Sequence, residues 1–259
     1  MTAVAAFAYE TWWLGLRTTL RFIRVPANSI SIVFFPLIQL FLFSQLFKDI
    51  VQVPGFGGES SYLNYLAPGQ VAFTSFFAVS WSGYGLLLEY RSGYLDKLRS
   101  LPIRRWSILA AEMVPLFLQA AFMSGIVLVV SILLGASIET GIPGFLTILA
   151  LAGLFGVGWA GTSFIPALMT KSEQATSSLS LLFFPFAFMS TAFVPEALMP
   201  EWIRFINDWN PITYLIEAIR PLMVSGFDWG AIGAALLAIA IMGVILQAAT
   251  IWAFHRLAR

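Results

Sequence analysis

The sequence predicts an all-α integral membrane protein with six membrane-spanning helices, an amphipathic N-terminal helix at the membrane interface, and short re-entrant helices between the fifth and sixth spans. Two observations carry this prediction. Of the 259 residues, 59% are hydrophobic and only 10% are charged, whereas soluble domains carry about 25% charged residues. The charged residues are also so unevenly spaced that long stretches contain none. We therefore expect a single transmembrane domain over 1–259 and no separate soluble domain.

Charge-free stretches locate the spans, because a charged side chain costs about 2.5 to 3.5 kcal/mol at the centre of a spanning helix. Six stretches of 22 to 31 residues lack any charged residue, and the next longest has 9. A helix needs about 20 residues to cross the bilayer. The predicted spans are 29–47, 67–88, 113–135, 146–169, 176–194 and 231–254.

The distribution of Lys and Arg predicts the orientation. The N-terminal segment, the 89–112 connection, the connection after the fourth span and the C-terminus hold 11 of the 14 basic residues, and the other side holds 3. Because basic residues are retained on the cytoplasmic side, both termini should be cytoplasmic in a plasma membrane of bacterial inner-membrane type. The net charge of +1 gives no reason to expect a nucleic-acid partner, and membrane lipids should cover the apolar faces.

Residues 1–28 form a predicted cytoplasmic interface helix. Its apolar positions follow helical spacing at Trp13, Leu16, Leu20 and Ile23, and its basic positions are Arg17, Arg21 and Arg24. This pattern is typical of a basic amphipathic helix that lies in the interface. Two interpretations stay open: a membrane anchor that also fixes orientation, and a docking surface for a cytoplasmic partner.

The connection 89–112 mixes both charges with apolar residues. Its charged residues are Glu89, Arg91, Asp96, Lys97, Arg99, Arg104, Arg105 and Glu112. A purely electrostatic loop would need neither the acidic residues nor Tyr94, Leu95, Leu98 and Leu101 between them. Pro102 separates a short helix from the approach to the third span. The pattern favours a helix that docks on a protein, and a solvated topology determinant is the alternative.

The connection 195–228 is too apolar for a free loop and too charged to span. Four prolines divide it, and Pro200 fits the first position of a helix. We interpret it as short helices that dip into the outer leaflet, where irregular backbone must be buried in protein or face water. It is a candidate outer gate; an interfacial belt built on Trp202, Trp209 and Trp229 is the alternative. The gate candidates are Trp202, Asn210, Pro211, Tyr214, Glu217 and Arg220.

The predicted spans contain no ionisable residue, which weighs against an ion-coupled secondary transporter. Their few polar residues, including Gln39, Ser75, Ser80 and Gln247, are expected to form hydrogen bonds between helices. An aromatic stripe at helical spacing either packs against lipid and helices or forms a surface for an apolar substrate. The candidate substrate path is Gln39, Phe73, Phe77, Trp81 and Tyr84.

Several catalytic features are absent from the sequence. A phosphate-binding loop places Gly before Lys, but Lys48, Lys97 and Lys171 follow Phe, Asp and Thr. The chain has no cysteine, and its one histidine, His255, lies at the end of the last span. We therefore expect no enzymatic activity, catalytic residue, metal or cofactor in this chain by itself.

Three features together resemble the membrane subunit of type-2 ATP-binding-cassette exporters, in particular the daunorubicin-resistance permeases. One is the basic amphipathic N-terminal helix. The second is the stretch from Glu89 to Leu109, which matches the family pattern at Glu89, Gly93, Leu95, Asp96, Leu98 and Pro102. The third is the segment from Asn210 to Arg220, which is similar to the family's Asn-Pro segment with its later arginine.

The resemblance implies a homodimer docked on two separate ATPase subunits, which would bind ATP and Mg. It implies that an amphipathic drug-like or lipid substrate is exported. Alternatives are a polysaccharide or glycolipid exporter of the same family, and an ATP-independent channel or secondary transporter. The ATPase-coupling residues that the resemblance and the charge pattern imply are Arg17, Arg21, Glu89, Arg91, Gly93, Asp96, Lys97, Leu98, Pro102, Arg104 and Arg105.

Overall fold

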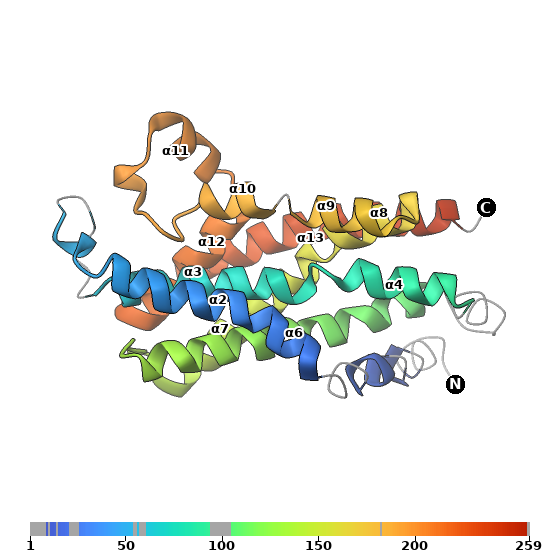
Figure 1. The fold of residues 1–259 in the computed structure, drawn as a ribbon, viewed down its shortest axis with the longest axis horizontal. Coiled ribbons are helices and arrows are strands. Elements are labelled where there is room, and N and C mark those ends of the chain that lie inside the picture. Colours follow the sequence, from blue (N-terminus) through green and yellow to red (C-terminus); the bar gives the residue numbers. More distant parts are fainter. Residues whose placement is uncertain are drawn as a thin grey trace.

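A computed structural model describes residues 9, 11–13, 15–20, 26–53, 56, 61–93, 105–181 and 183–257. The regular structure of this part of the chain is helical, and most helices lie along one long axis (Figure 1). The elements are α2 (Pro26–Leu46), η1 (Ile50–Gln52), α3 (Tyr62–Val79), α4 (Ser82–Arg91), α6 (Arg105–Leu133), α7 (Gly141–Trp159), α8 (Gly161–Thr170), α9 (Glu173–Ser180), α10 (Phe183–Phe188), η2 (Glu196–Leu198), α11 (Glu201–Asn207), α12 (Pro211–Val224) and α13 (Trp229–Leu257). Residues 11–13 and 15–20 are also helical.

Within the described residues, four helical segments are long and apolar enough to cross a membrane. They are Tyr62–Leu88, Ala110–Leu133, Gly141–Thr170 and Trp229–Phe254. These segments coincide with the predicted second, third, fourth and sixth spans, so the multi-pass membrane class is confirmed. The first predicted span overlaps α2 and ends one residue beyond it; the stretch Val33–Leu46 of α2 is a shorter apolar helix.

The fifth predicted span, 176–194, is not among these four segments and is not one continuous helix. The chain instead forms α9, then α10, and continues in turns from Met189. Two local features accompany the difference. Pro185 has no N–H group for the Leu181 carbonyl; that carbonyl accepts from Phe184 N at 3.1 Å instead, and Pro185 lies in the first turn of α10. Helix α9 is also rich in hydroxyl groups, and its Ser180 Oγ donates to the Ser80 carbonyl of another segment at 2.8 Å.

The two ends of the bundle carry different connections between helices. The helical residues 11–13 and 15–20 and the C-terminal end of α13 lie at one end, together with the end of α4 and the junction of α8 with α9 (Figure 1). We call this the terminal end. The opposite end carries η1, the turn between α6 and α7, and α11; there Glu139 N donates to the Met223 carbonyl at 3.0 Å. This grouping agrees with the predicted sidedness of the connections.

Helix α3 is the centre of the bundle, and nearly all its residues are buried. It packs against α2, α6, α7 and α12. Serine side chains join it to its neighbours: Ser75 Oγ donates to the Ala152 carbonyl at 2.5 Å, and Ser124 Oγ donates to the Val71 carbonyl at 3.1 Å. Small polar residues allow such close approach between spans, so the expected hydrogen bond between helices is confirmed for Ser75.

Candidate functional site

Three of the helical segments are interrupted, and hydrogen bonds join the interruptions. Helix α3 gives way to α4 at Ser80 and Trp81, α7 gives way to α8 at Ala160, and α9 ends at Ser180. The Ser80 carbonyl accepts a hydrogen bond from Ser163 Oγ at 2.7 Å and another from Ser180 Oγ at 2.8 Å. All three serines are buried. We call Ser80, Ser163 and Ser180 the serine junction.

The backbone groups released at the interruptions find side-chain partners. Gly83 N donates to Ser163 Oγ at 3.0 Å. Two glutamines come from the uninterrupted helices: Gln119 of α6 donates to the Ala78 carbonyl at 2.7 Å, and Gln247 of α13 donates to the Val157 carbonyl at 2.8 Å. Unpaired backbone groups cost several kcal/mol each in hydrocarbon, so these side chains make the interruptions tolerable. The predicted role of Gln247 between helices is confirmed.

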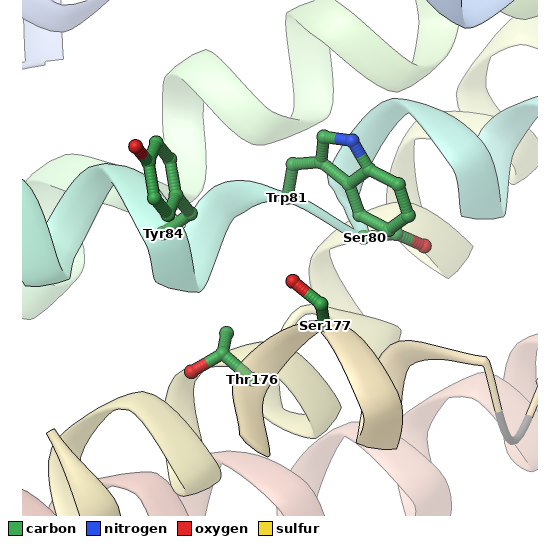
Figure 2. A pocket seen from close by; sticks show the side chains of 5 residues that line it. All are labelled: Ser80, Trp81, Tyr84, Thr176 and Ser177. Atoms are coloured by element: carbon green, nitrogen blue, oxygen red, sulfur yellow. The ribbon is translucent and has the colours of Figure 1, made fainter. Parts of the chain in front are cut away.

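Two hollows meet at Trp81, whose side chain is 53% exposed. The first, of about 210 Å³, is lined by Ser80, Trp81, Tyr84, Thr176 and Ser177. Figure 2 shows three of these residues along the segment from α3 to α4 and the other two on the facing α9. We call it the hydroxyl hollow. The second, of about 280 Å³, is lined by Phe35, Phe76, Phe77, Trp81, Ser180, Leu181 and Phe184, and we call it the aromatic hollow.

The chemistry of the two hollows is complementary. Hydroxyl groups line the first, and aromatic rings dominate the second; neither has a charged side chain among its described lining residues. Trp81 belongs to both, so a ligand in contact with it could place a polar group on one side and an apolar body on the other. Such sites typically combine apolar walls with a few convergent polar groups.

The structure divides the five candidate path residues. Phe77, Trp81 and Tyr84 line the hollows. Phe73 is only 1% exposed and stacks on Phe77 with ring centroids 5.0 Å apart, so it supports the wall from behind. Gln39 is buried in α2, lines neither hollow, and its Oε1 has no hydrogen-bond partner among the described residues.

At the terminal end, α4 and α9 are joined by charges. Arg91 at the end of α4 forms an ion pair with Glu173 at the start of α9. Lys171 Nζ lies 4.9 Å from the centroid of the Tyr90 ring, within range of a cation–π contact. Gly93 follows α4 with a φ of +70°, the left-handed conformation with which glycine commonly ends a helix.

The remaining coupling candidates are described in part. Arg17 lies in the helical residues 15–20; the neighbouring Thr18 Oγ1 donates to Glu112 Oε1 of α6 at 3.3 Å. Glu89 belongs to α4, and Arg105 begins α6. The other candidates lie outside the described residues: Arg21, Asp96, Lys97, Leu98, Pro102 and Arg104.

At the opposite end, Asn210 and Pro211 begin α12. Asn210 Oδ1 accepts from Ile212 N at 3.0 Å, its Nδ2 donates to the Phe186 carbonyl at 2.6 Å, and Pro211 is the first helical residue. Asparagine at the N-cap followed by proline is a strong helix start. Tyr214 donates to the Asp208 carbonyl at 2.8 Å, and Trp202 on α11 is exposed; neither joins the cluster described next.

Glu217 and Arg220 are the two gate candidates that the structure brings together. Arg220 Nη1 lies 2.5 Å from Glu217 Oε1, its Nη2 donates to the Thr191 carbonyl at 2.9 Å, and its guanidinium carbon lies 4.1 Å from the centroid of the Tyr65 ring. Thr191 Oγ1 also donates to Glu217 Oε1 at 2.7 Å, and Tyr65 OH donates to the Thr191 carbonyl at 2.9 Å. We call Tyr65, Thr191, Glu217 and Arg220 the outer cluster; it ties α12 to α3.

Sequence reasoning missed several of these residues. Ser163 and Ser180 carry no spacing signal, because their partners are distant in sequence. Glu173 could have been found: Lys171, Ser172 and Glu173 separate two charge-free stretches, and Ser172 is a typical N-cap residue. Its Oγ does accept from Ala175 N, at 3.4 Å. Thr191 and Tyr65 had no sequence signal, because they lie 29 and 155 residues before Arg220.

These features define a multi-pass α-helical membrane protein whose central helices are interrupted at an uncharged, amphipathic hollow. Comparison with known proteins gives its family. Residues 9–224 match the ABC-2 type transporter family, and the chain belongs to that family. Membrane proteins of this family are permease subunits, generally non-catalytic, and the family implies a separate ATPase partner subunit.

The chain is similar to several curated permeases. It is 27% identical over 225 residues to the daunorubicin resistance ABC transporter permease protein DrrB1 of Streptomyces coeruleorubidus, with 86% of this chain and 76% of the relative covered. It is 30% identical over 218 residues to the putative transport permease ycf38 of Porphyra purpurea, with 80% and 70% covered. It is 26% identical over 173 residues to the inner membrane transport permease YhhJ of Escherichia coli, with 66% and 44% covered.

Proposed function

We propose that this chain is the transmembrane subunit of an ATP-driven exporter that moves amphipathic, drug-like or lipid molecules outward across the plasma membrane. It acts as a homodimer with two ATPase subunits, and both of its termini are cytoplasmic. The observation that carries the substrate class is the pair of hollows at Trp81, one lined by hydroxyl groups and the other by aromatic rings. The name of the Streptomyces relative, a daunorubicin resistance permease, supports the same class.

The course of the chain supports six spans. It passes between the two ends along α2, α3 with α4, α6, α7 with α8, α9 with α10, and α13 (Figure 1). Helix α2 has 21 residues, which corresponds to about 31 Å at 1.5 Å per residue and matches a hydrocarbon core of about 30 Å. The pass through α9 and α10 is the least regular; within it Ser180 donates to the Ser80 carbonyl and the Phe186 carbonyl accepts from Asn210.

Coupling to the ATPase is assigned to the terminal end. The N-terminal interface helix and the 89–112 connection dock on the ATPase subunit, which binds ATP and Mg. The contact between Thr18 and Glu112 joins this helix to α6, and the pair of Arg91 with Glu173 joins α4 to α9. Movement of the partner at this surface would therefore reach the helices that carry the hollows.

The outer cluster is assigned as the outer gate. It contains one Arg–Glu pair whose arginine side chain is 14% exposed, held on two further residues. Breaking such a partly buried pair is expensive because an uncompensated charge remains. The cluster therefore keeps α12 against α3 until export opens this end.

Reconstitution tests the proposal. Proteoliposomes should contain the chain with its ATPase subunit, with the chain alone as the control, and should be loaded with a fluorescent anthracycline, a fluorescent phospholipid analogue or a labelled oligosaccharide. We expect ATP-dependent movement of the anthracycline or the phospholipid, only when both subunits are present. Movement by the chain alone would contradict the proposal in favour of an ATP-independent channel, and movement of only the oligosaccharide would contradict the substrate class.

A further inference from the structure

We propose that α9 is a movable wall of the hydroxyl hollow, latched at one end by Ser180 on the Ser80 carbonyl and at the other by Glu173 on Arg91. Release of the two latches lets α9 swing away from Trp81 and opens the hollow to a ligand. This inference rests on the proposed function, because it names the moving part of the proposed substrate site.

The position of α9 makes it one complete side of the hollow. Thr176 and Ser177 lie on α9 and face Ser80, Trp81 and Tyr84 across the space (Figure 2). The opposite side of the hollow is formed by the segment from α3 to α4, which includes Trp81. Any change in the distance between α4 and α9 therefore changes the width of the hollow directly.

Helix α9 is short and has an interruption at each end. It spans eight residues, from Glu173 to Ser180. Lys171, immediately before its N-cap, has a φ of +53°, and the helix ends before Leu181. A rigid segment bounded by irregular backbone can tilt by changing a few dihedral angles at each boundary, without distorting its own hydrogen bonds.

The Ser180 latch can open without leaving its hydroxyl group unpaired. Ser180 Oγ lies 2.8 Å from the Ser80 carbonyl and 3.0 Å from the Thr176 carbonyl, one turn earlier in its own helix. When α9 moves away, the hydroxyl keeps the Thr176 carbonyl as its acceptor. The Ser80 carbonyl meanwhile retains the hydrogen bond from Ser163. Both groups thus stay paired in the closed and the open arrangement, which keeps the desolvation penalty of opening low.

The Ser163 contacts hold α8 to α4 and give the motion a fixed reference. Ser163 Oγ donates to the Ser80 carbonyl and accepts from Gly83 N, so it binds both sides of the interruption between α3 and α4. Its hydroxyl has no second carbonyl acceptor among the described hydrogen bonds. A Cβ atom at position 83 would overlap the Ser163 carbonyl, which shows how closely the two helices approach. Helices α4 and α8 therefore stay together while α9 moves.

The second latch lies at the terminal end, where the ATPase subunit is proposed to dock. Arg91 and Glu173 are half-exposed, with side chains 51% and 43% accessible. An exposed pair contributes little stability, so a competing charge on a partner could replace one member. The Arg91–Glu173 pair is therefore a releasable contact at the surface where the ATPase subunit is proposed to dock.

Spin-label distances test the latch directly, because the chain has no cysteine and introduced thiols are unique. One pair, Leu88→Cys with Leu179→Cys, joins exposed positions on α4 and α9; a reference pair, Leu88→Cys with Met169→Cys, joins α4 and α8. Labelled chains are diluted into unlabelled chains so that each assembly carries one labelled copy. We expect Ser180→Ala, in the chain without its ATPase subunit, to add a population of longer distances between α4 and α9. The distance between α4 and α8 should stay unchanged.

Controls separate the latch from general loosening. Ser180→Thr keeps the hydroxyl and should restore the original distribution, and Ser124→Ala removes a buried hydrogen bond between α6 and α3 and should not change it. Glu173→Gln should lengthen the α4–α9 distance, whereas Glu196→Gln, which weakens an ion pair at the opposite end, should not. An unchanged α4–α9 distance in Ser180→Ala, or an equal change in the α4–α8 distance, would overturn the proposal.

The complex with the ATPase subunit gives the second measurement. Trapping the complex with ATP and vanadate should produce the same population of longer α4–α9 distances in a chain that carries only the two label sites. If Ser180→Ala lengthens the distance but the ATPase subunit neither binds nor moves α9, the latch stands and the proposed ATP-driven function fails. If the subunit binds and drives export while the α4–α9 distance stays fixed, the latch is overturned and the proposed function stands.

Discussion

Helices α6 and α13 contrast with the interrupted segments that they flank. Each of the two is a single helix of 29 residues, whereas the passes through α3 and α4, α7 and α8, and α9 and α10 each contain an interruption. Helix α13 is largely exposed, and its outward side chains, such as Leu237 and Val244, are apolar. The interrupted segments contain the serine junction and both hollows.

The comparison teaches how polar backbone can be placed inside a membrane. Gln119 and Gln247 of the uninterrupted helices donate to backbone carbonyls of the interrupted ones. The interruptions then expose a tryptophan and several hydroxyl groups without an ionised residue. Irregular backbone at membrane depth is tolerated only where it is buried in protein or lines a cavity, and here it does both.

The largest effect is expected at the closest approach between an interruption and its neighbour. Gly83→Ala places a methyl group into the Ser163 carbonyl, whereas Gly85→Ala, in the same helix, meets no atom within 4 Å. Overpacking typically destabilises by about 1 to 3 kcal/mol, and alanine is otherwise the better helix former. We expect Gly83→Ala to lower the unfolding temperature in detergent and Gly85→Ala to leave it equal or raised. Equal effects would show that α4 and α8 do not approach as described.

Ser163→Ala should have the next largest effect. It removes the donor to Ser80 and the acceptor for Gly83 N at once, and an unsatisfied buried group costs about 1 to 3 kcal/mol. Ser124→Ala removes one hydrogen bond between α6 and α3, so its loss should be smaller, about 1 kcal/mol or less. Chemical unfolding of the two variants in the same mixed micelles makes the comparison. A greater loss for Ser124→Ala would contradict the special position of the junction.

The glutamines test whether the uninterrupted helices support the interrupted ones. Gln119→Leu and Gln247→Leu each remove the side-chain donor to a backbone carbonyl, and hydrogen bonds between membrane helices contribute about 0.6 kcal/mol on average. Both should lower stability by about that amount and raise amide exchange near Ser82 and Gly161, respectively. Gln45→Leu, at an exposed position of α2, should do neither.

The smallest stability effect is expected for Arg91 and Glu173. Their ion pair is half-exposed, and such pairs contribute about 0 to 1 kcal/mol. Arg91→Glu should therefore leave the unfolding temperature nearly unchanged and still reduce ATP-driven transport, because it removes the contact between α4 and α9. The exchange of both charges, Arg91→Glu with Glu173→Arg, should recover part of the transport. No recovery would assign Arg91 to direct contact with the ATPase subunit.

The sequence predicted the class, and four of its six spans coincide with long apolar helices. Long stretches without charged residues predicted these spans correctly, because a charged side chain is costly at the centre of a membrane-spanning helix. The fifth predicted span is not among the four and stays a prediction; its segment forms two short helices, and Pro185 and the hydroxyl-rich residues before it carry no formal charge. Charge counting cannot detect such an interruption. Proline position alone cannot either, because Pro36, Pro68 and Pro115 lie inside helices.

The candidate site was predictable only in part. Helical spacing found Phe77, Trp81 and Tyr84, which line the hollows, and it also selected Phe73, which is buried one turn away. Spacing identifies a helix face but not its depth in the bundle. Arg220 was found through the family-like segment from Asn210, within which Glu217 also lies, and their partners Tyr65 and Thr191 lie on other segments. The serine junction joins residues 83 and 100 positions apart in sequence, beyond any local pattern.

The most direct test of the central claim is the flux of an amphipathic probe through the complex when Trp81, shared by both hollows, is removed. Trp81→Ala and the control Trp252→Ala, an exposed tryptophan on α13, are reconstituted with the ATPase subunit, and ATP-dependent export of a fluorescent anthracycline is followed over its concentration. The account predicts that Trp81→Ala raises KM about tenfold or more, as expected for the loss of roughly 1.4 kcal/mol of binding energy, and that Trp252→Ala leaves it unchanged. Unaltered KM and maximal flux in Trp81→Ala would contradict the claim that these hollows bind the substrate.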